Sequence, residues 1–380
     1  MSRTVWLTRV GVTLLATSMV GWPATPSPAA GTTGVASVYD VTKVKYSAGN
    51  SKTNKVVVTR SGNTITFDDR VTIKAGTGCK AVKGDTTKVR CTTKKAPTWI
   101  YVYLNDGDDS VVNKTDRSMY ATGGMGNDSL TGGSRGDVLK GEEGNDKLDG
   151  RAGNDTLDGD VGNDLLSGGD GNDALYGWWG NDTMHGGNGD DNLQGLDGND
   201  VEYGDAGADS LSGGQGSDRL EGGTGDDALS GDDPRDGAVS ADIMLGGPGR
   251  DQVNYQWYSK PVTVDLDGAA RDDGQAGEHD TVGADVEDIA GGSGSDRLTG
   301  NAAANNITGW NGNDVIHGLG GDDVLDGLEG RDTVYGDAGD DLLFGQDSAE
   351  VADRLDGGDN GTAGDECQPG TADTTVNCER

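Results

Sequence analysis

The sequence is poor in the residues that usually carry catalysis or nucleic-acid binding. It has two Phe and three His, and only 30 Lys and Arg stand against 65 Asp and Glu, so its formal net charge is −35. Phosphate binding needs clustered Lys and Arg, and this balance therefore argues against a nucleic-acid partner. The His residues (185, 279 and 317) form no HExxH motif and no recognisable triad. We therefore expect no enzymatic activity.

Long hydrophobic runs are also scarce. One apolar stretch, VGVTLLATSMV at 10–20, follows Arg3 and Arg9 and precedes small residues and prolines up to Ala30. It is too short for a permanent membrane-spanning helix, and this order is typical of a secretory signal. We predict that residues 1–30 are a cleaved signal peptide. The mature protein would then be secreted, possess no integral membrane segment, and be soluble or surface-associated. An uncleaved N-terminal anchor is the alternative.

Cysteine is limited to two close pairs, Cys79 with Cys91 and Cys367 with Cys378. An even number of Cys in an exported chain favours disulfides, each of which would close a short loop. Structural zinc is the alternative, but C-x2-C spacing is absent and no His accompanies either pair.

Glycine is abundant, with 68 residues, and it marks a repeat of nine residues. Twelve uninterrupted blocks run over 123–230, one more covers 246–254, six more cover 291–344, and LNDGDDSVV at 104–112 looks like a degenerate first copy. Column one is Gly in all nineteen blocks. Column four is Gly except at Arg135 and Ala303, column six is Asp except at Asn305, and column eight is apolar except at Glu202.

Each column has a physical cause. Gly permits a positive φ and a close backbone turn, and an apolar residue flanked by polar ones indicates a short strand with one side chain facing inward. One block cannot bury its single apolar side chain alone, so the blocks must stack as a solenoid. Column six then stacks carboxylates about 4.8 Å apart, which repel one another unless a cation neutralises them. Ca²⁺ suits carboxylate and carbonyl oxygens better than Mg²⁺, which demands stricter geometry.

These blocks resemble the RTX nonapeptide, GGxGxDxUx, of haemolysin-type calcium-binding proteins. The resemblance covers about half of the chain and implies an all-β fold, a parallel β-roll in which two blocks form one coil and Ca²⁺ lies between turns. It also implies that Asn305 weakens a site and that Glu202 shifts its strand, turning Val201 or Tyr203 inward. The implied metal ligands are the column-six carboxylates, completed by backbone carbonyls: Asp128, Asp137, Asp146, Asp155, Asp164, Asp173, Asp182, Asp191, Asp200, Asp209, Asp218, Asp227, Asp251, Asp296, Asp314, Asp323, Asp332 and Asp341.

The remaining segments suggest further parts. Residues 31–104 carry a net charge of +9 with alternating, strand-like runs, which predicts a small β-domain or cap. Residues 105–254 would form the first part of the roll, 255–290 an interrupting strand and loop, 291–344 the second part, and 345–380 a C-terminal cap closed by a disulfide. Because residues 105–380 carry a net charge of −46, we expect folding to require Ca²⁺.

Three functional hypotheses follow. A calcium-binding structural or interaction protein at or outside the cell surface is the first. An adhesin or ligand-binding module is the second, in which the basic N-terminal segment binds an anionic polymer or the Trp178–Trp179 pair stacks on a glycan. A remnant of an RTX exoenzyme or toxin is the third, although the chain leaves little room for a catalytic domain. Many RTX proteins lack an N-terminal signal peptide and avoid Cys, whereas this chain has a predicted signal peptide and two Cys pairs, so toxin-like activity is an unsafe inference from the resemblance.

Overall fold

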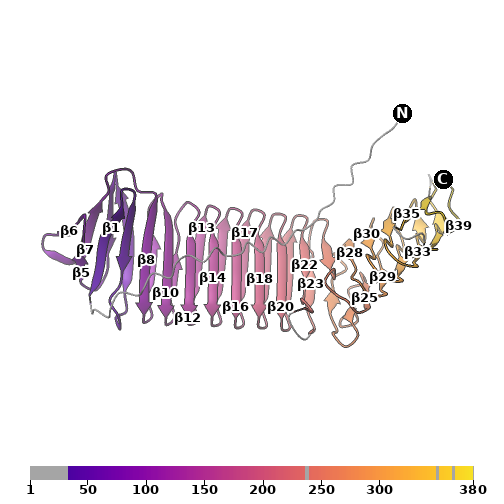
Figure 1. Cartoon of the computed structure of the whole chain (residues 1–380), viewed down its shortest axis with the longest axis horizontal. Coiled ribbons are helices and arrows are strands. Elements are labelled where there is room, and N and C mark those ends of the chain that lie inside the picture. The colour runs from indigo at the N-terminus through magenta and orange to yellow at the C-terminus, as the bar shows by residue number, and fades with distance from the viewer. Residues whose placement is uncertain (1–32, 236–238, 348–350, 362–363, 380) are drawn as a thin grey trace.

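The computed structural model describes residues 33–235, 239–347, 351–361 and 364–379, and within these ranges every regular element is a β-strand. The predicted signal peptide at 1–30 lies outside the described residues. Figure 1 shows an elongated stack of strands. No helix in the described ranges is long and apolar enough to cross a membrane.

The strands form two long walls that face each other, together with a third sheet that continues the second wall. We name these sheets A, B and C. Sheet A has seventeen strands, in spatial order β5 (Ile73–Ala75), β1 (Gly34–Asp40), β2 (Lys43–Ser47), β8 (Trp99–Asp106), β10 (Ser118–Met125), β12 (Val138–Glu143), β14 (Thr156–Val161), β16 (Ala174–Trp179), β18 (Asn192–Asp197), β20 (Ser210–Gln215), β22 (Ala228–Ser230), β24 (Gln252–Asn254), β28 (Asp288–Ala290), β30 (Asn306–Thr308), β32 (Val324–Asp326), β35 (Leu342–Gly345) and β38 (Glu366–Pro369).

Sheet B lies opposite the first part of sheet A, and sheet C lies opposite the second part. Sheet B has thirteen strands: β27 (Thr281–Val282), β23 (Ile243–Leu245), β21 (Arg219–Thr224), β19 (Val201–Ala206), β17 (Thr183–Asn188), β15 (Leu165–Asp170), β13 (Lys147–Ala152), β11 (Ser129–Thr131), β9 (Ser110–Asn113), β3 (Lys55–Ser61), β4 (Thr64–Asp68), β7 (Asp85–Thr92) and β6 (Cys79–Val82). Sheet C has seven: β26 (Gly274–Gln275), β25 (Val262–Asp265), β29 (Arg297–Thr299), β31 (Val315–His317), β33 (Thr333–Tyr335), β36 (Arg354–Asp356) and β39 (Thr374–Val376). A short parallel pair, β34 (Ala338–Gly339) and β37 (Asp359–Asn360), completes the described strands.

The register of the roll is set by the repeat. Leu148 pairs with Leu166 and Leu166 with Met184, always in parallel and eighteen residues apart, so two blocks form one coil. Successive blocks alternate between the facing sheets, and the column-eight side chains, such as Leu157 and Leu166, are fully buried between them. This all-β parallel roll confirms the predicted fold class.

The basic N-terminal segment closes one end of the roll. Strands β2 and β3 pair in parallel with β8 and β9, so both walls run on into this segment. Tyr46 and Phe67 stack inside it, with ring centroids 5.6 Å apart. The predicted disulfides are confirmed: Cys79–Cys91 joins β6 to β7, and Cys367–Cys378 ties β38 to the last described residues.

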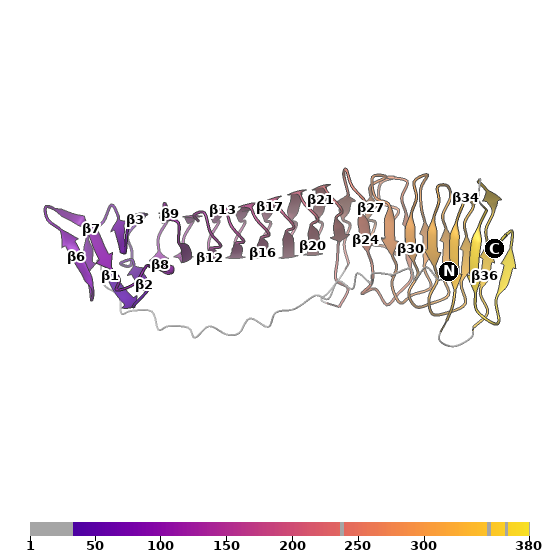
Figure 2. The ribbon, with the colours of Figure 1, turned by 90° about the horizontal axis from the view of Figure 1, so that it is seen from above.

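The interruption at 255–290 does not end the roll. Sheet A passes through it, because Val253 pairs directly with Ile289. The opposite wall changes there from sheet B, which ends at β27, to sheet C, which begins at β25 and β26. Strands β12 to β20 face the viewer in Figure 1 and lie edge-on in Figure 2, whereas β30 is seen broadside in Figure 2, so the roll turns about its long axis at this segment.

The C-terminal segment, 345–380, no longer follows the nine-residue repeat in sequence, but its strands continue the parallel stack. Leu343 pairs with Cys367, and Leu355 pairs with Thr375, as the parallel ladder requires. Leu355 is fully buried like the earlier column-eight residues. The extra residues therefore lengthen the turns without breaking the stack.

One local expectation is wrong. Glu202 does not turn its strand, because Val201 and Tyr203 remain only partly buried while Glu202 itself is 0% exposed. It occupies the core position between Met184 and Leu220. Parallel pairing on both sides holds the register of β19, so the carboxylate is carried inside with it.

Candidate metal centre

The column-six carboxylates form continuous ladders along the edges of the sheets. Each Asp follows a turn and precedes a strand, and its N–H donates to Oδ1 of the Asp one coil further on; for example, Asp146 donates to Asp164, and Asp164 to Asp182, both at 2.7 Å. Three ladders result. Ladder 1, beside sheet B, runs from Asp109 to Asp280, and ladder 3, beside sheet C, runs from Asp296 to Asp373. Ladder 2, beside sheet A, runs from Asp137 to Asp365. Its pattern changes between Glu287 and Asn305, where Nδ2 of Asn305 donates to the carbonyl of Glu287 instead.

The second oxygen of nearly every ladder carboxylate is buried without a partner. Among the eighteen predicted ligands, all at most 3% exposed, sixteen have an Oδ2 with no hydrogen bond; the exceptions are Asp137 and Asp296. A buried carboxylate oxygen without a partner costs several kcal/mol in desolvation. Because these unpartnered oxygens recur regularly, each position is suited to a bound cation that would complete it.

Backbone oxygens approach the same points. A Cβ built on Gly186 would lie 2.5 Å from Oδ2 of Asp191 and 2.7 Å from the carbonyl oxygen of Gly204, one coil away. Only glycine leaves this space open. The space is bounded by one carboxylate and one carbonyl oxygen, the donor types that Ca²⁺ prefers. The residues present therefore fit a hard divalent cation.

Column four needs glycine for a different reason. Gly162 has φ +151°, and a Cβ there would overlap the carbonyl oxygen of Gly144 in the preceding coil. At the column-four glycines the turns thus stack with their backbones in direct contact, and a side chain there would have no room. The two exceptions, Arg135 and Ala303, lie in the coils just before Gly153 and Gly321, which pack on them. This contact holds successive carboxylates at the spacing of neighbouring strands.

Column two controls whether a carboxylate is left unpartnered. At Asp137 and Asp296, Oδ2 already accepts the N–H of the residue four positions earlier, Gly133 at 2.5 Å and Gly292 at 2.8 Å. Neither glycine has a positive φ. Where column two is left-handed, as at Arg151 with φ +76°, the following Asp155 keeps its Oδ2 unpartnered. The first Asp of ladder 2 and the first Asp of ladder 3 are therefore closed by backbone, whereas the Asp residues that follow a left-handed column two remain open.

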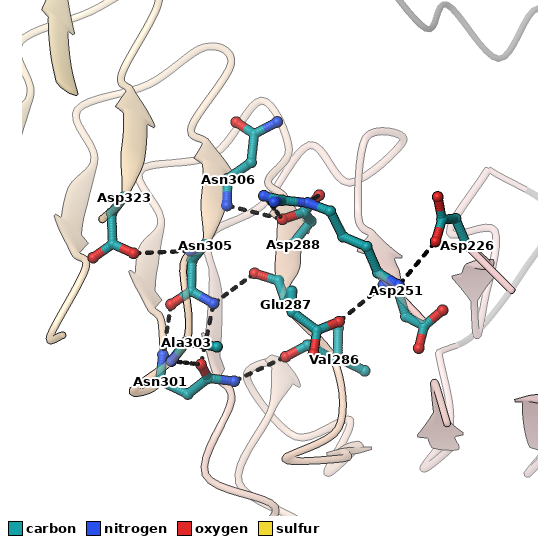
Figure 3. Close-up of polar contacts among 11 residues, drawn as sticks. Asp226, Asp251, Val286, Glu287, Asp288, Asn301, Ala303, Asn305, Asn306 and Asp323 are labelled. Atoms are coloured by element: carbon teal, nitrogen blue, oxygen red, sulfur yellow. Dashed lines mark hydrogen bonds and ion pairs between the residues drawn. The ribbon is translucent and has the colours of Figure 1, made fainter. Parts of the chain in front are cut away.

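Asn305 is satisfied without a cation. Its Nδ2 donates to the carbonyl of Glu287 at 2.8 Å, and its Oδ1 accepts the N–H of Asn301, also at 2.8 Å. Its own N–H still donates to Asp323 in the next coil. Figure 3 shows these bonds where the two halves of the roll meet. The amide supplies a donor where the other blocks have an unpartnered oxygen.

Burial makes ionisation of the ladder carboxylates unfavourable while no cation is bound. Desolvation is the main cause that raises the pKa of Asp155 and of Asp314 to about 8, and neighbouring carboxylates raise it further while a backbone N–H lowers it. The pKa of Asp242 rises to about 10 for the same principal reason. A bound dication would remove this penalty by supplying the opposite charge.

Sequence reasoning missed several members of the ladders. Asp109, Asp242, Asp353 and Asp365 are at most 4% exposed, and Oδ2 of the first three has no hydrogen bond. Asp242 follows a lengthened turn, and the last two lie in the tail, so a strict count of nine passed over them. An Asp two residues before a core residue, as in Asp242 and Met244, is the signal that would have found them.

A second row of side chains, in column five, was also missed. The N–H of Asn163 donates to Oδ1 of Asn145, and that of Asn181 to Oδ1 of Asn163, both at 2.8 Å. The row is exposed and fully hydrogen-bonded at these positions. It supports the turns beside ladder 1 and leaves the carboxylates as the unsatisfied groups.

The comparison with protein families agrees with this geometry. A family model described as the RTX calcium-binding nonapeptide repeat matches in several overlapping copies: residues 122–157, 149–184, 158–193, 185–220, 203–233, 283–316, 290–325 and 317–348. The chain is an RTX nonapeptide-repeat protein. The matched repeats coincide with the stacked turns of this RTX roll and with its carboxylate ladders. No curated protein matches the chain.

Proposed function

We propose that this RTX protein is exported and reaches its folded form when Ca²⁺ enters the ladders, and that it then serves as a structural or interaction module at or outside the cell surface. One observation carries the proposal: buried Oδ2 atoms without partners recur coil after coil. The identity of the repeat as a calcium-binding one names the ion.

Different residues of the roll position the carboxylates and keep the space for the ion open. Backbone N–H groups fix Oδ1 of each ladder Asp, which aims Oδ2 at the next turn. Glycines in columns one and four keep the space open and the turns in contact. When Ca²⁺ is bound, its positive charge neutralises two stacked carboxylates. Folding and binding are then one coupled process.

Export is supported by the two disulfides, which persist in oxidising compartments. It is also supported by the low cytosolic supply of Ca²⁺, which would keep the chain unfolded before secretion. The proposal includes no enzymatic activity, since the chemistry concentrated in this chain is oxygen coordination.

A count of bound ions tests the proposal. Equilibrium dialysis of the mature chain should find many bound Ca²⁺ ions that Mg²⁺ does not displace, and Asp182→Asn should lower the number. Asp170→Asn is the matched control, because Asp170 is an exposed acid outside the ladders. No bound Ca²⁺, or an equal loss in both variants, would contradict the assignment.

A second candidate function has one observation in its favour. A surface hollow of about 500 Å³ on the N-terminal segment is lined by Lys80, Lys83 and Arg90, all exposed. Clustered cations on an otherwise acidic protein suit an anionic surface polymer. Retention on immobilised dextran sulfate, lost in Lys80→Ser/Lys83→Ser, would support this docking role, whereas equal retention of both proteins would refute it.

A further inference from the structure

A connection outside the repeat brings a third carboxylate to ladder 3. Asp347 lies between β35 and β36, and one carboxylate oxygen from each of Asp332, Asp347 and Asp353 lies within 4.8 Å of the other two. Elsewhere in the ladders, a carboxylate interacts electrostatically with its neighbours in the adjacent coils, as Asp164 does with Asp146 and Asp182. Within the described ranges one other triplet converges this closely, and two of its three members are exposed.

All three side chains are held in the same way. Oδ1 of Asp332 accepts the N–H of Asp314 at 2.8 Å, Oδ1 of Asp353 accepts that of Asp332 at 2.8 Å, and Oδ1 of Asp347 accepts that of Gly330 at 3.3 Å. Backbone donors thus fix one oxygen of each carboxylate. Because Gly330 belongs to the turn that ends at Asp332, Asp347 is attached to the same turn as its partner.

The other oxygen of each side chain is buried and has no hydrogen bond. This holds for Oδ2 of Asp332, Asp347 and Asp353, and the first and last of these residues are only 1% and 3% exposed. Three unpartnered carboxylate oxygens in one buried place cannot be stable as they stand. The arrangement is complete only with a cation among them.

The spacing admits one calcium ion among the three oxygens, and the calcium-binding repeat around the site names the ion. Oxygens on opposite sides of one ion are separated by twice the metal–oxygen distance, about 4.6–5.2 Å for Ca²⁺ and about 4.0–4.2 Å for Mg²⁺. Separations of at most 4.8 Å are compatible with one Ca²⁺ among the three oxygens. A third carboxylate also raises the negative charge of the site, which tightens calcium binding.

We propose that Asp332, Asp347 and Asp353 form a three-carboxylate calcium site, tighter than the two-carboxylate positions of the ladders, that attaches Asp347, just beyond the end of β35, to ladder 3. The ion is the one that fills the ladders, so this proposal rests on the proposed function. Its new element is Asp347, which no repeat column supplies.

Calorimetric titration of the metal-stripped mature chain with Ca²⁺ tests the site. We expect one ion in the tightest class to be lost, or weakened at least about tenfold, in Asp347→Asn. Asp359→Asn is the control, because Asp359 is exposed, lies at the same end of the roll and removes the same charge. It should bind as the unchanged protein does.

The outcomes separate the two proposals. A protein that binds no Ca²⁺ at all would overturn both. Normal calcium binding that is identical in Asp347→Asn and the unchanged chain would overturn the three-carboxylate site alone. Asp347→Ala, compared by circular dichroism at saturating Ca²⁺, guards against a folding defect: a native spectrum with one weakened ion supports the site, and an equal number of tight ions refutes it.

Discussion

Replacing Glu202 by Leu should stabilise the protein substantially. The Glu202 side chain is 0% exposed and lies in the core column between Met184 and Leu220. Neither of its carboxylate oxygens makes a hydrogen bond of normal geometry, although the N–H groups of Gly195 and Ser212 lie close enough to lower its pKa slightly. Burial raises that pKa well above the usual range, and the charges of ladder Asp residues add to the rise.

The size of the gain follows from two contributions. Burying a leucine side chain contributes about 1.5–3 kcal/mol. Removing a buried polar group without partners contributes a further amount of about 1–3 kcal/mol. We therefore expect Glu202→Leu to raise the free energy of unfolding by about 2.5–6 kcal/mol near neutral pH, in excess Ca²⁺.

The pH dependence of the free energy of unfolding provides a second, independent test of the burial of Glu202. Because the folded-state pKa of Glu202 lies above its unfolded value of 4.5, its contribution to stability is intact below about pH 4.5 and is lost as the pH rises towards the folded pKa. The loss is at most about 1.4 kcal/mol per pH unit. The advantage of Glu202→Leu should therefore grow between pH 5 and pH 8.

Urea denaturation at both pH values measures these effects. Glu143→Leu is the matched control, since Glu143 is exposed and should gain nothing. If Glu202→Leu proved no more stable than the unchanged protein, with the same pH dependence, Glu202 would have a partner or a position other than the one described here.

Three further predictions concern the ladders, the joint and the N-terminal segment. Without metal, the fold should be more stable at pH 5 than at pH 8, because the folded-state pKa of Asp155 and Asp314, about 8, exceeds the usual 3.8. Circular dichroism of the metal-stripped protein measures this difference, and a stronger β-signal at pH 8 would contradict the prediction. Asn305→Asp should lower the melting temperature in chelator, because the change removes the donor to the partly buried carbonyl of Glu287, and added Ca²⁺ should restore part of the loss. An unchanged melting temperature in chelator would contradict this prediction. Replacing Cys79 and Cys91 by Ser should cost about 3 kcal/mol by chemical denaturation, as expected for a loop of this length, and no loss would show that the loop is fixed by other contacts.

The regular part of the molecule was predictable because each column has one physical task. A constant nine-residue phase with an apolar eighth position allows stacked strands and little else. The Asp column then implies the ladders, including Asp164 and Asp182, without any knowledge of distances. Disulfide pairing was accessible for a similar reason, since each Cys has one near neighbour in sequence.

What escaped prediction lies in the turns. After the lengthened turn the parallel pairing resumes in register, with Met244 opposite Leu220. Asp242 and Asp353 therefore belong to ladders that a strict count of nine had ended. The backbone conformation at column two could not be predicted either, because Gly133 and Gly169 are the same residue type and yet only Gly169 has a left-handed φ. Sequence does not state which of the two conformations a glycine adopts.

Glu202 shows how tertiary pairing overrides a local preference. A carboxylate in the core column suggested that the strand would rotate. Parallel hydrogen bonding to both neighbours fixes β19, and a shift by one residue would expose an entire row of the strand. The cost of one buried carboxylate is smaller than the cost of losing that register.

The central claim, that calcium neutralises the ladders and so permits the roll to form, is tested most directly by far-ultraviolet circular dichroism of the metal-stripped mature chain during titration with Ca²⁺, with Mg²⁺ as the control. The account predicts a cooperative gain of β-signal with Ca²⁺ that Mg²⁺ does not reproduce. A fully formed β-spectrum in chelator at pH 8 would contradict it, because the buried carboxylates would then be neutralised by something other than a bound cation.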